Sequence, residues 1–222
     1  MAMKIELELY TNELIREVGD DAKSLFTGQI DQARAYGIPD QSLRVGAKAP
    51  LFSLPSATGE VIELRQLLQH GPVVLVFYRG GWCPYCNIQL RSYQSILSSL
   101  KQMRACLVAI SPENPDHTVE TKSREKFEFH VLSDNNNVVA RQFGLVFPVS
   151  SEVLMIFKDR WNLDLKEQNG VDGGELPVPG TYVIDRDGTI IFSRADVDYR
   201  NRTEPEEILE ALRSSKSSFQ LN

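Results

Sequence analysis

Cys83 and Cys86 stand three positions apart and are the residues of this chain best suited to do chemistry. The run Val73–Tyr78 before them is apolar and rich in β-branched and aromatic residues, which is typical of a buried strand. After a short loop with one arginine and two glycines, residues from Pro84 to about Arg104 show helical periodicity. Two cysteines at this spacing, between a strand and a helix, predict a thiol–disulfide site.

The surroundings of the cysteine pair favour a reactive thiolate. If Cys83 is the N-cap of the helix, Pro84 takes the first helical position, where its missing N–H costs nothing, and Cys86 takes the third. Unpaired N–H groups and the positive end of the helix dipole then favour a negative sulfur, and Arg79 adds a positive charge just upstream. Such surroundings lower a cysteine pKa from about 8.5 to near or below neutrality. Because only the thiolate attacks a disulfide or a peroxide, the pair supplies a nucleophile and a second thiol that resolves the product.

Three neighbours of the pair allow more than one interpretation. Trp82 is expected to pack over the helix start rather than to contact substrate, whereas for Tyr85 packing and substrate contact both stay open. For Arg79, a solvated loop charge and a contact with the thiolate or the substrate stay equally open.

Zinc and a structural disulfide explain the cysteine pair less well. A zinc site commonly takes about four ligands, but there is no second cysteine pair. The histidines show no ligand spacing: His70, His117 and His130. The third cysteine, Cys106, lies inside the apolar run Ala105–Ile110 and is expected to be a core residue. We therefore expect neither a metal nor a cofactor.

Composition limits the class of protein. The 222 residues carry a formal net charge of −6, which argues against broad affinity for nucleic acids. No run approaches the roughly 20 apolar residues of a membrane span. The first residues lack the pattern of a secretory signal, and three cysteines are too few for a secreted disulfide scaffold. A cytoplasmic location, with no membrane or nucleic-acid partner, is expected.

The chain is predicted to begin with a helical arm at residues 1–44. Apolar residues recur there at three- and four-residue steps from about Ile5 to Tyr36, and Gly19 and Gly28 are expected to break the helix into pieces. The arm carries no chemical motif. It is expected to pack on the domain or on a second subunit.

Residues 45–216 are predicted to form one domain, with an insertion at about 148–176 and a tail at 217–222. The predicted strands are Leu51–Leu54, Val61–Leu64, Val73–Tyr78, Ala105–Ile110, His130–Leu132, Thr181–Asp185 and Thr189–Ser193. The predicted helices besides the motif helix are Leu64–Gln69, Asp116–Phe129, Val138–Phe143, Glu152–Glu167 and Glu204–Ser214. Residues 144–150 and 169–175 are predicted to be loops. This alternation favours an α/β fold with a central mixed sheet flanked by helices on both faces.

The segment Trp82–Cys86 after a buried strand resembles the active-site motif of the thioredoxin superfamily, and Cys-Pro-Tyr-Cys is the form used by glutaredoxins. Pro179 stands just before Thr181–Asp185, where thioredoxin-like proteins carry a cis-proline that faces the cysteine pair. The resemblance implies a thioredoxin-like fold with an N-terminal helical extension, and a cis Val178–Pro179 bond.

The wider framework, from about Val45 to Leu212, resembles the peroxiredoxins of the alkyl hydroperoxide reductase/thiol-specific antioxidant class. The likeness rests on the opening Gly46–Phe52, on the motif strand and on the late hairpin. Peroxiredoxins carry Pro-x-x-x-Thr-x-x-Cys after that strand and an arginine before the hairpin. In this chain those four positions hold, in order, Arg79, Cys83, Cys86 and Pro179. The chain therefore keeps the peroxidatic cysteine and departs at the proline, the threonine and the arginine.

The resemblance implies a thiol-dependent peroxidase that reduces hydroperoxides through a Cys83/Cys86 dithiol–disulfide cycle, with an external thioredoxin- or glutaredoxin-like dithiol as reductant. Cys83 attacks first by the thioredoxin analogy and Cys86 by the peroxiredoxin analogy, and both orders stay open. One alternative is a thiol–disulfide oxidoreductase acting on protein or glutathione disulfides. Another is a non-catalytic redox sensor or interaction module. The arm and the 148–176 insertion are expected to shape the cleft or a homodimer interface.

Overall fold

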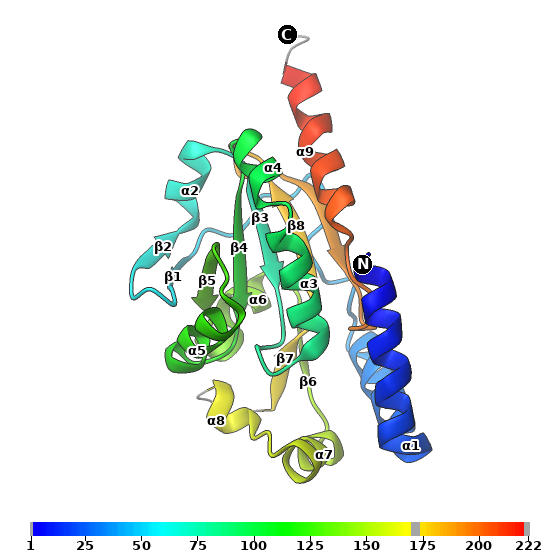
Figure 1. Ribbon diagram of the computed structural model, residues 1–222. Helices are drawn as coiled ribbons and strands as arrows, with labels where there is room; N and C mark the ends of the chain where they lie inside the picture. The colour runs from blue at the N-terminus through cyan, green and yellow to red at the C-terminus, as the bar shows by residue number, and fades with distance from the viewer. Residues whose placement is uncertain (1, 170–173, 220–222) are drawn as a thin grey trace.

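The structure is a computed structural model that describes residues 2–169 and 174–219. Its centre is a mixed sheet with the strand order β5-β4-β3-β8-β9 (Figure 1). These strands are β3 (Val73–Phe77), β4 (Cys106–Ser111), β5 (His130–Ser133), β8 (Gly180–Ile184) and β9 (Ile190–Ala195). The strands β3, β4 and β5 run parallel, whereas β8 is antiparallel to both β3 and β9. The predicted α/β fold around a central mixed sheet is confirmed.

Helices cover both faces of this sheet (Figure 1). On one face lie α3 (Pro84–Gln94), α4 (Leu97–Gln102) and α9 (Pro205–Phe219), and on the other α2 (Leu64–His70) and α6 (Val138–Gln142). The remaining helices are α1 (Met3–Ala35), α5 (Pro115–Glu125), the 3-10 helix η1 (Asn135–Asn137), α7 (Ser151–Trp161) and α8 (Leu165–Asn169). None of the helices in the described residues is long and apolar enough to cross a membrane.

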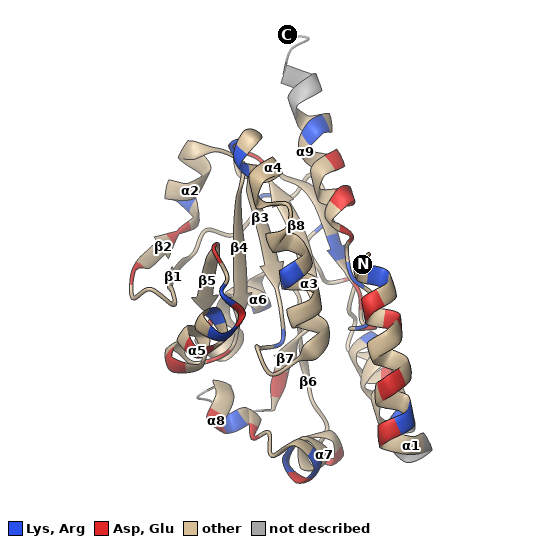
Figure 2. Ribbon diagram, in the orientation of Figure 1, with Lys and Arg blue, Asp and Glu red and all other residues tan. Residues whose placement is uncertain are grey.

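The central strand β3 is apolar throughout because both of its faces are covered. Val74 and Val76 belong to the core cluster under α3 and α9, and Val73, Leu75 and Phe77 belong to the cluster under α2 and α6. Successive side chains of a strand point to opposite faces, so a strand buried on both sides reads as an unbroken apolar run. Figure 2 shows the consequence: β3 and its neighbours β4 and β8 carry no charged residue, whereas the surrounding helices carry both signs.

Two small antiparallel pairs complete the fold. The hairpin of β1 (Ser53–Pro55) and β2 (Val61–Glu63) agrees with its prediction. The pair of β6 (Val146–Pro148) and β7 (Glu175–Pro177) does not, because residues 144–150 were predicted to be a loop. The strand β6 exists because it pairs with a segment that follows the whole insertion, and a local pattern does not show such a partner.

The N-terminal arm forms one long helix, α1, with a kink. Gly19 has the non-helical backbone angles φ 74° and ψ −178°, so the predicted break at Gly19 is confirmed, whereas the predicted break at Gly28 is wrong. A φ of this sign is accessible to glycine at little cost. On either side of the kink α1 lies against α3 and α7 (Figure 1). The arm therefore contacts both the motif helix and the insertion.

The insertion and the C-terminus differ in detail from their predictions. The segment predicted as one helix, Glu152–Glu167, is divided between α7 and α8, because Asn162 adopts a left-handed conformation and ends α7. The helix α9 continues to Phe219, so the predicted tail at 217–222 begins inside a helix. Of the loop predicted at 169–175, residues 170–173 lie outside the described part of the chain.

Candidate active site

The cysteine pair lies after the end of β3, at the start of α3. Cys83 is the N-cap of α3 with extended backbone angles, and Pro84 occupies the first turn, as predicted. Cys86 follows in that turn, and its backbone N–H donates to the carbonyl of Cys83 at 3.0 Å. Both cysteines are reduced and almost inaccessible, with exposed fractions of 3% for Cys83 and 0% for Cys86. Pro84 itself is exposed.

The loop before the pair is held tightly by its surroundings. Gly81 accepts two hydrogen bonds on its carbonyl, from Asn87 Nδ2 and from Arg124 Nη2, each at 2.7 Å. A Cβ added at Gly81 would lie 1.9 Å from Thr121 Oγ1, and one added at Gly80 would lie 2.2 Å from the Trp82 ring nitrogen. Only glycine fits these two positions, which explains the pair of glycines in the motif loop.

The environment of Cys86 strongly favours its thiolate. Burial alone raises the pKa of Cys86, but the hydrogen bond from Cys83, the Arg202 guanidinium and the backbone N–H of Arg79 together lower it to about 5. The Nη2 atom of Arg202 lies 3.6 Å from the sulfur of Cys86. Burial and the adjacent Cys86 hold the pKa of Cys83 well above its usual range. At neutral pH the pair therefore consists of a Cys86 thiolate and a Cys83 thiol.

A buried polar network fixes Arg202 beside Cys86. Its Nε donates to the carbonyl of Tyr199 and its Nη1 to Gln89 Oε1, both at 2.7 Å. Gln89 lies on α3 one turn beyond Cys86, and its Nε2 donates to Tyr93 Oη at 2.9 Å. Tyr93 in turn donates to the carbonyl of Thr203 at 2.8 Å. Hydrogen bonds from Nε and Nη1 to Tyr199 and Gln89 thus fix the guanidinium of Arg202, and its Nη2 is left to contact the sulfur of Cys86.

Arg79 lies in an aromatic cage. Its guanidinium carbon lies 4.5 Å from the ring centre of Tyr199, 5.1 Å from that of Trp82 and 5.8 Å from that of Phe157. With 4% of its surface exposed, Arg79 is not a solvated loop charge, so that interpretation is wrong. It contributes positive charge to both cysteines. Trp82 packs against Arg79 and Phe157, as expected.

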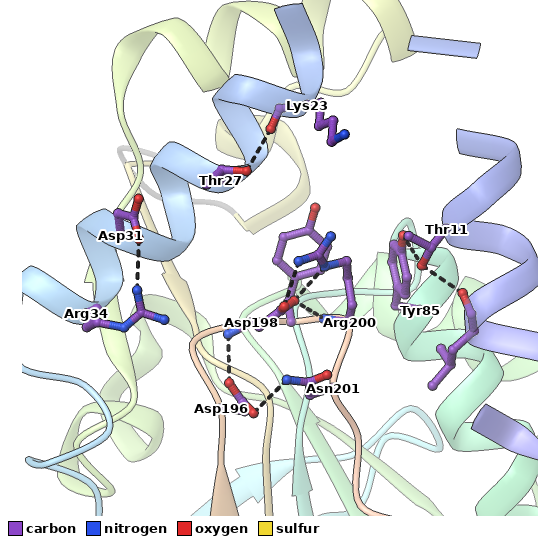
Figure 3. A network of polar contacts seen from close by, with 12 residues as sticks. Thr11, Lys23, Thr27, Asp31, Arg34, Tyr85, Asp196, Asp198, Arg200 and Asn201 are labelled. Carbon is purple, nitrogen blue, oxygen red and sulfur yellow. Dashed lines mark hydrogen bonds and ion pairs between the residues drawn. The ribbon is translucent and has the colours of Figure 1, made fainter. Parts of the chain in front are cut away.

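The arm covers Tyr85, and this contact decides between the two interpretations of that residue. Tyr85 is buried, and its hydroxyl lies 3.0 Å from Thr11 Oγ1 (Figure 3). Its ring meets that of Tyr10 edge-on, with the ring centres 5.0 Å apart. Tyr85 therefore packs against α1. A cavity of about 210 Å³ lies beside it, under the kink of α1, and reaches Tyr199 and Arg200. Arg200 forms a two-pronged ion pair with Asp198 there (Figure 3).

Pro179 lies near the site, but its peptide bond corrects a prediction. The cis bond within the described residues is Ile38–Pro39, so the predicted cis Val178–Pro179 bond is wrong. The backbone N–H of Val178 donates to the carbonyl of Leu145 and continues the β6–β7 pairing up to the start of β8, which keeps the chain extended there. Pro179 is buried and shares a small cavity with Arg79 and Tyr199.

The sequence did not reveal the residues outside the motif that surround the two cysteines and affect their pKa values. Arg202, Gln89 and Tyr199 had no motif around them, and Glu113, a carboxylate under the Gly81 loop, resembled an ordinary loop charge. No group of three or more potential metal ligands occurs among the described residues. Cys106 is the first residue of β4, paired with Val73 of β3, and it is only partly buried against the core, so it is less buried than the expected core residue.

Comparisons with known proteins give consistent matches. The AhpC/TSA family matches residues 45–193. A putative peroxiredoxin bcp of Coxiella burnetii is 28% identical over 71% of this chain and 93% of its own length. A putative peroxiredoxin of Mycobacterium tuberculosis is 30% identical over 55% of this chain and 84% of its own. The crystal structure of peroxidoxin BcpB from M. tuberculosis superposes with a TM-score of 0.60 at 25% identity, over 78% of this chain and 97% of that one.

Proposed function

The chain belongs to the AhpC/TSA family, and we propose that it is a thiol-dependent peroxidase in which Cys86 attacks the hydroperoxide and Cys83 resolves the product. The observation that carries this order is the contact between the Arg202 guanidinium and the Cys86 sulfur at 3.6 Å. Because peroxide reacts with the thiolate and not with the thiol, the cysteine whose pKa is lowered is the nucleophile. Relatives named as peroxiredoxins support the same chemistry.

Two displacements at sulfur complete the oxidative half of the cycle. The Cys86 thiolate attacks the terminal peroxide oxygen, so an S–O bond forms, the O–O bond breaks and an alkoxide leaves, which takes up a proton to become the alcohol. Cys86 is now a sulfenic acid, and the peroxide has gained two electrons. The Cys83 sulfur then attacks the Cys86 sulfur, the S–O bond breaks, and the hydroxide leaves as water with the proton of Cys83.

A thioredoxin-type order, with Cys83 attacking first, is disfavoured by the same geometry. In that order Cys83 has to be ionised at neutral pH, but its burial and the negative charge of Cys86 raise its pKa. With the arm in place, no more than 3% of the surface of either cysteine is exposed, which favours small hydroperoxides over protein disulfides as the substrate.

The cavity under the kink of α1 is the approach route that we propose for the hydroperoxide. Tyr85 and Tyr199 line it; Tyr85 stands between the two cysteines in the first turn of α3, and the carbonyl of Tyr199 accepts from the Arg202 that contacts Cys86, so the cavity adjoins the pair. We further propose that a thioredoxin- or glutaredoxin-like dithiol reduces the disulfide, which requires the arm at residues 1–44 to move aside from the domain at 45–216. A homodimer and a cytoplasmic location remain predictions.

Stopped-flow oxidation of the reduced protein tests this function. Hydrogen peroxide and cumene hydroperoxide are expected to oxidise it far faster than free cysteine, with loss of two thiols. Cys86→Ser abolishes the reaction, whereas Cys83→Ser retains it and stops at a sulfenic acid that dimedone labels. A rate no better than that of free cysteine would refute the peroxidase. Rapid reduction of insulin disulfides would then point to the oxidoreductase, and inertness in both assays to a sensor.

A further inference from the structure

Glu113 is a buried carboxylate in the wall of the active site that the mechanism above does not use. It follows β4 and has an exposed fraction of 1%. The hydroxyl of Ser111 donates to its Oε2 at 3.2 Å, and the backbone N–H of Gly81, in the loop just before the cysteines, donates to its carboxylate. Its own backbone carbonyl accepts from the hydroxyl of Ser133. The side chain is therefore held in place and directed at the motif loop.

No arginine or lysine neutralises this carboxylate within the described residues. The titratable groups that face it are Tyr78 just after β3, Cys86 from α3 and His117 from α5. Nδ1 of His117 lies 3.5 Å from Oε2 of Glu120, so this histidine is paired with another carboxylate. The nearby Arg124 donates to the Gly81 carbonyl and to Glu125 instead. A buried carboxylate without a cationic partner is held more easily in its neutral form.

Glu113 and Cys86 are near enough to influence each other. Burial raises the pKa of Glu113 to about 7, and the negative charge of Cys86 contributes to that rise. Interaction between titrating groups is reciprocal, so a charge on Glu113 also disfavours the Cys86 thiolate. Burial and the negative charge of the Cys86 thiolate therefore both favour the neutral form of Glu113 in the reduced enzyme.

The redox cycle removes that charge. The reduced pair carries a thiolate and a thiol, whereas the disulfide is neutral, so the oxidative half-reaction combines thiolate, thiol, hydroperoxide and a proton to give disulfide, alcohol and water. We propose that Glu113 holds the proton that this half-reaction consumes: it is protonated beside the Cys86 thiolate and ionises when the Cys83–Cys86 disulfide forms. Glu113 acts through its electrostatic coupling to Cys86 and is a positioning residue. This inference rests on the proposed order of the cysteines.

Proton uptake from solvent during oxidation tests the role of Glu113. The reduced protein is oxidised in weak buffer with a pH indicator, and the protons taken up are divided by the disulfides formed. Without an internal source the ratio is about one at neutral pH. We expect the ratio for the native protein at pH 7 to be clearly below that for Glu113→Gln, whose amide oxygen can still accept from Gly81. Glu120→Gln, at an exposed carboxylate of the same segment, is the matched control and should behave as the native protein. Equal ratios in all three proteins would overturn the proposal.

Two further measurements keep the test decisive. Diamide oxidises the same thiols with the same proton balance, so the measurement works even if peroxide does not react, and a failed peroxidase is told apart from a failed role of Glu113. If Glu113→Gln does not fold, the native protein supplies the answer. Its ratio should rise between pH 7 and pH 9, because Glu113 is then already ionised in the reduced state and solvent must supply the proton. A ratio independent of pH would overturn the proposal.

Discussion

The guanidinium of Arg202 lies 3.6 Å from the sulfur of Cys86, although 116 positions separate the two residues in the chain. The resemblance to peroxiredoxins led us to expect an arginine before the late hairpin, and this chain has Pro179 there. Arg202 comes from the segment after β9 instead, and Gln89 and Tyr199 fix its orientation. A positive charge beside the sulfur of Cys86 is therefore supplied from a different part of the fold than the resemblance implied.

Removal of this charge should slow peroxide reduction. In Arg202→Gln the thiolate loses a charge-assisted hydrogen bond worth about 1.5–3 kcal/mol, so the pKa of Cys86 rises from about 5 to roughly 6–7 and the rate at pH 6 falls by roughly 2- to 10-fold, because less of the thiol is ionised. Thiolate absorbance at 240 nm and stopped-flow rates measure the two effects. Arg194→Gln, which removes an exposed arginine paired with Glu207, is the control and should change neither.

The pH profile of the oxidation step should follow Cys86 alone. Its pKa of about 5 in the folded protein lies below that of a free thiol, so the thiolate is present above pH 6 and disappears as the pH falls through 5. The second-order rate constant for hydrogen peroxide should therefore be flat from pH 6 to 8 and decline below. A rate that still rises between pH 7 and 9 would mean that the attacking thiol is Cys83, whose pKa is raised.

The contact between Thr11 and Tyr85 should govern access to the cysteines. Thr11→Val removes the 3.0 Å hydrogen bond between α1 and α3 and should lower the free energy of unfolding by about 0.5–1.5 kcal/mol. With the arm less firmly held, alkylation of the reduced pair by iodoacetamide should become several-fold faster. Thr27→Val is matched because Thr27 bonds only its own helix, at Lys23. Unchanged alkylation in both variants would show that the arm does not limit access.

The glycine at position 81 should be irreplaceable. In Gly81→Ala the new Cβ would lie 1.9 Å from Thr121 Oγ1, so the motif loop or α5 must shift. We expect a loss of about 1–3 kcal/mol in stability, as for other overpacked sites, and at least a tenfold slower oxidation by peroxide. Gly28→Ala, in the middle of α1 with no atom within 4 Å of the new Cβ, should be neutral or slightly stabilising. Wild-type kinetics in Gly81→Ala would contradict this account of the loop.

Local features of the sequence were enough to predict the scaffold of the site. The apolar run of β3, Cys83 as N-cap and Pro84 in the first turn depend on residues that are neighbours in the chain, and each was found as predicted. One error, the loop predicted at residues 144–150, occurred where a distant partner decides, because the strand β6 needs β7.

Residues close in the chain are sufficient to predict that a strand leads two thiols to the start of a helix, because hydrophobic periodicity and helix capping act between near neighbours. Which of the two thiols is ionised depends on contacts that the folded chain alone creates. That choice depends on Coulomb interactions and burial, which act through space: Arg202 comes to Cys86 from beyond β9, Arg79 is enclosed by rings from three segments, and Glu113 reaches Gly81 from the end of β4.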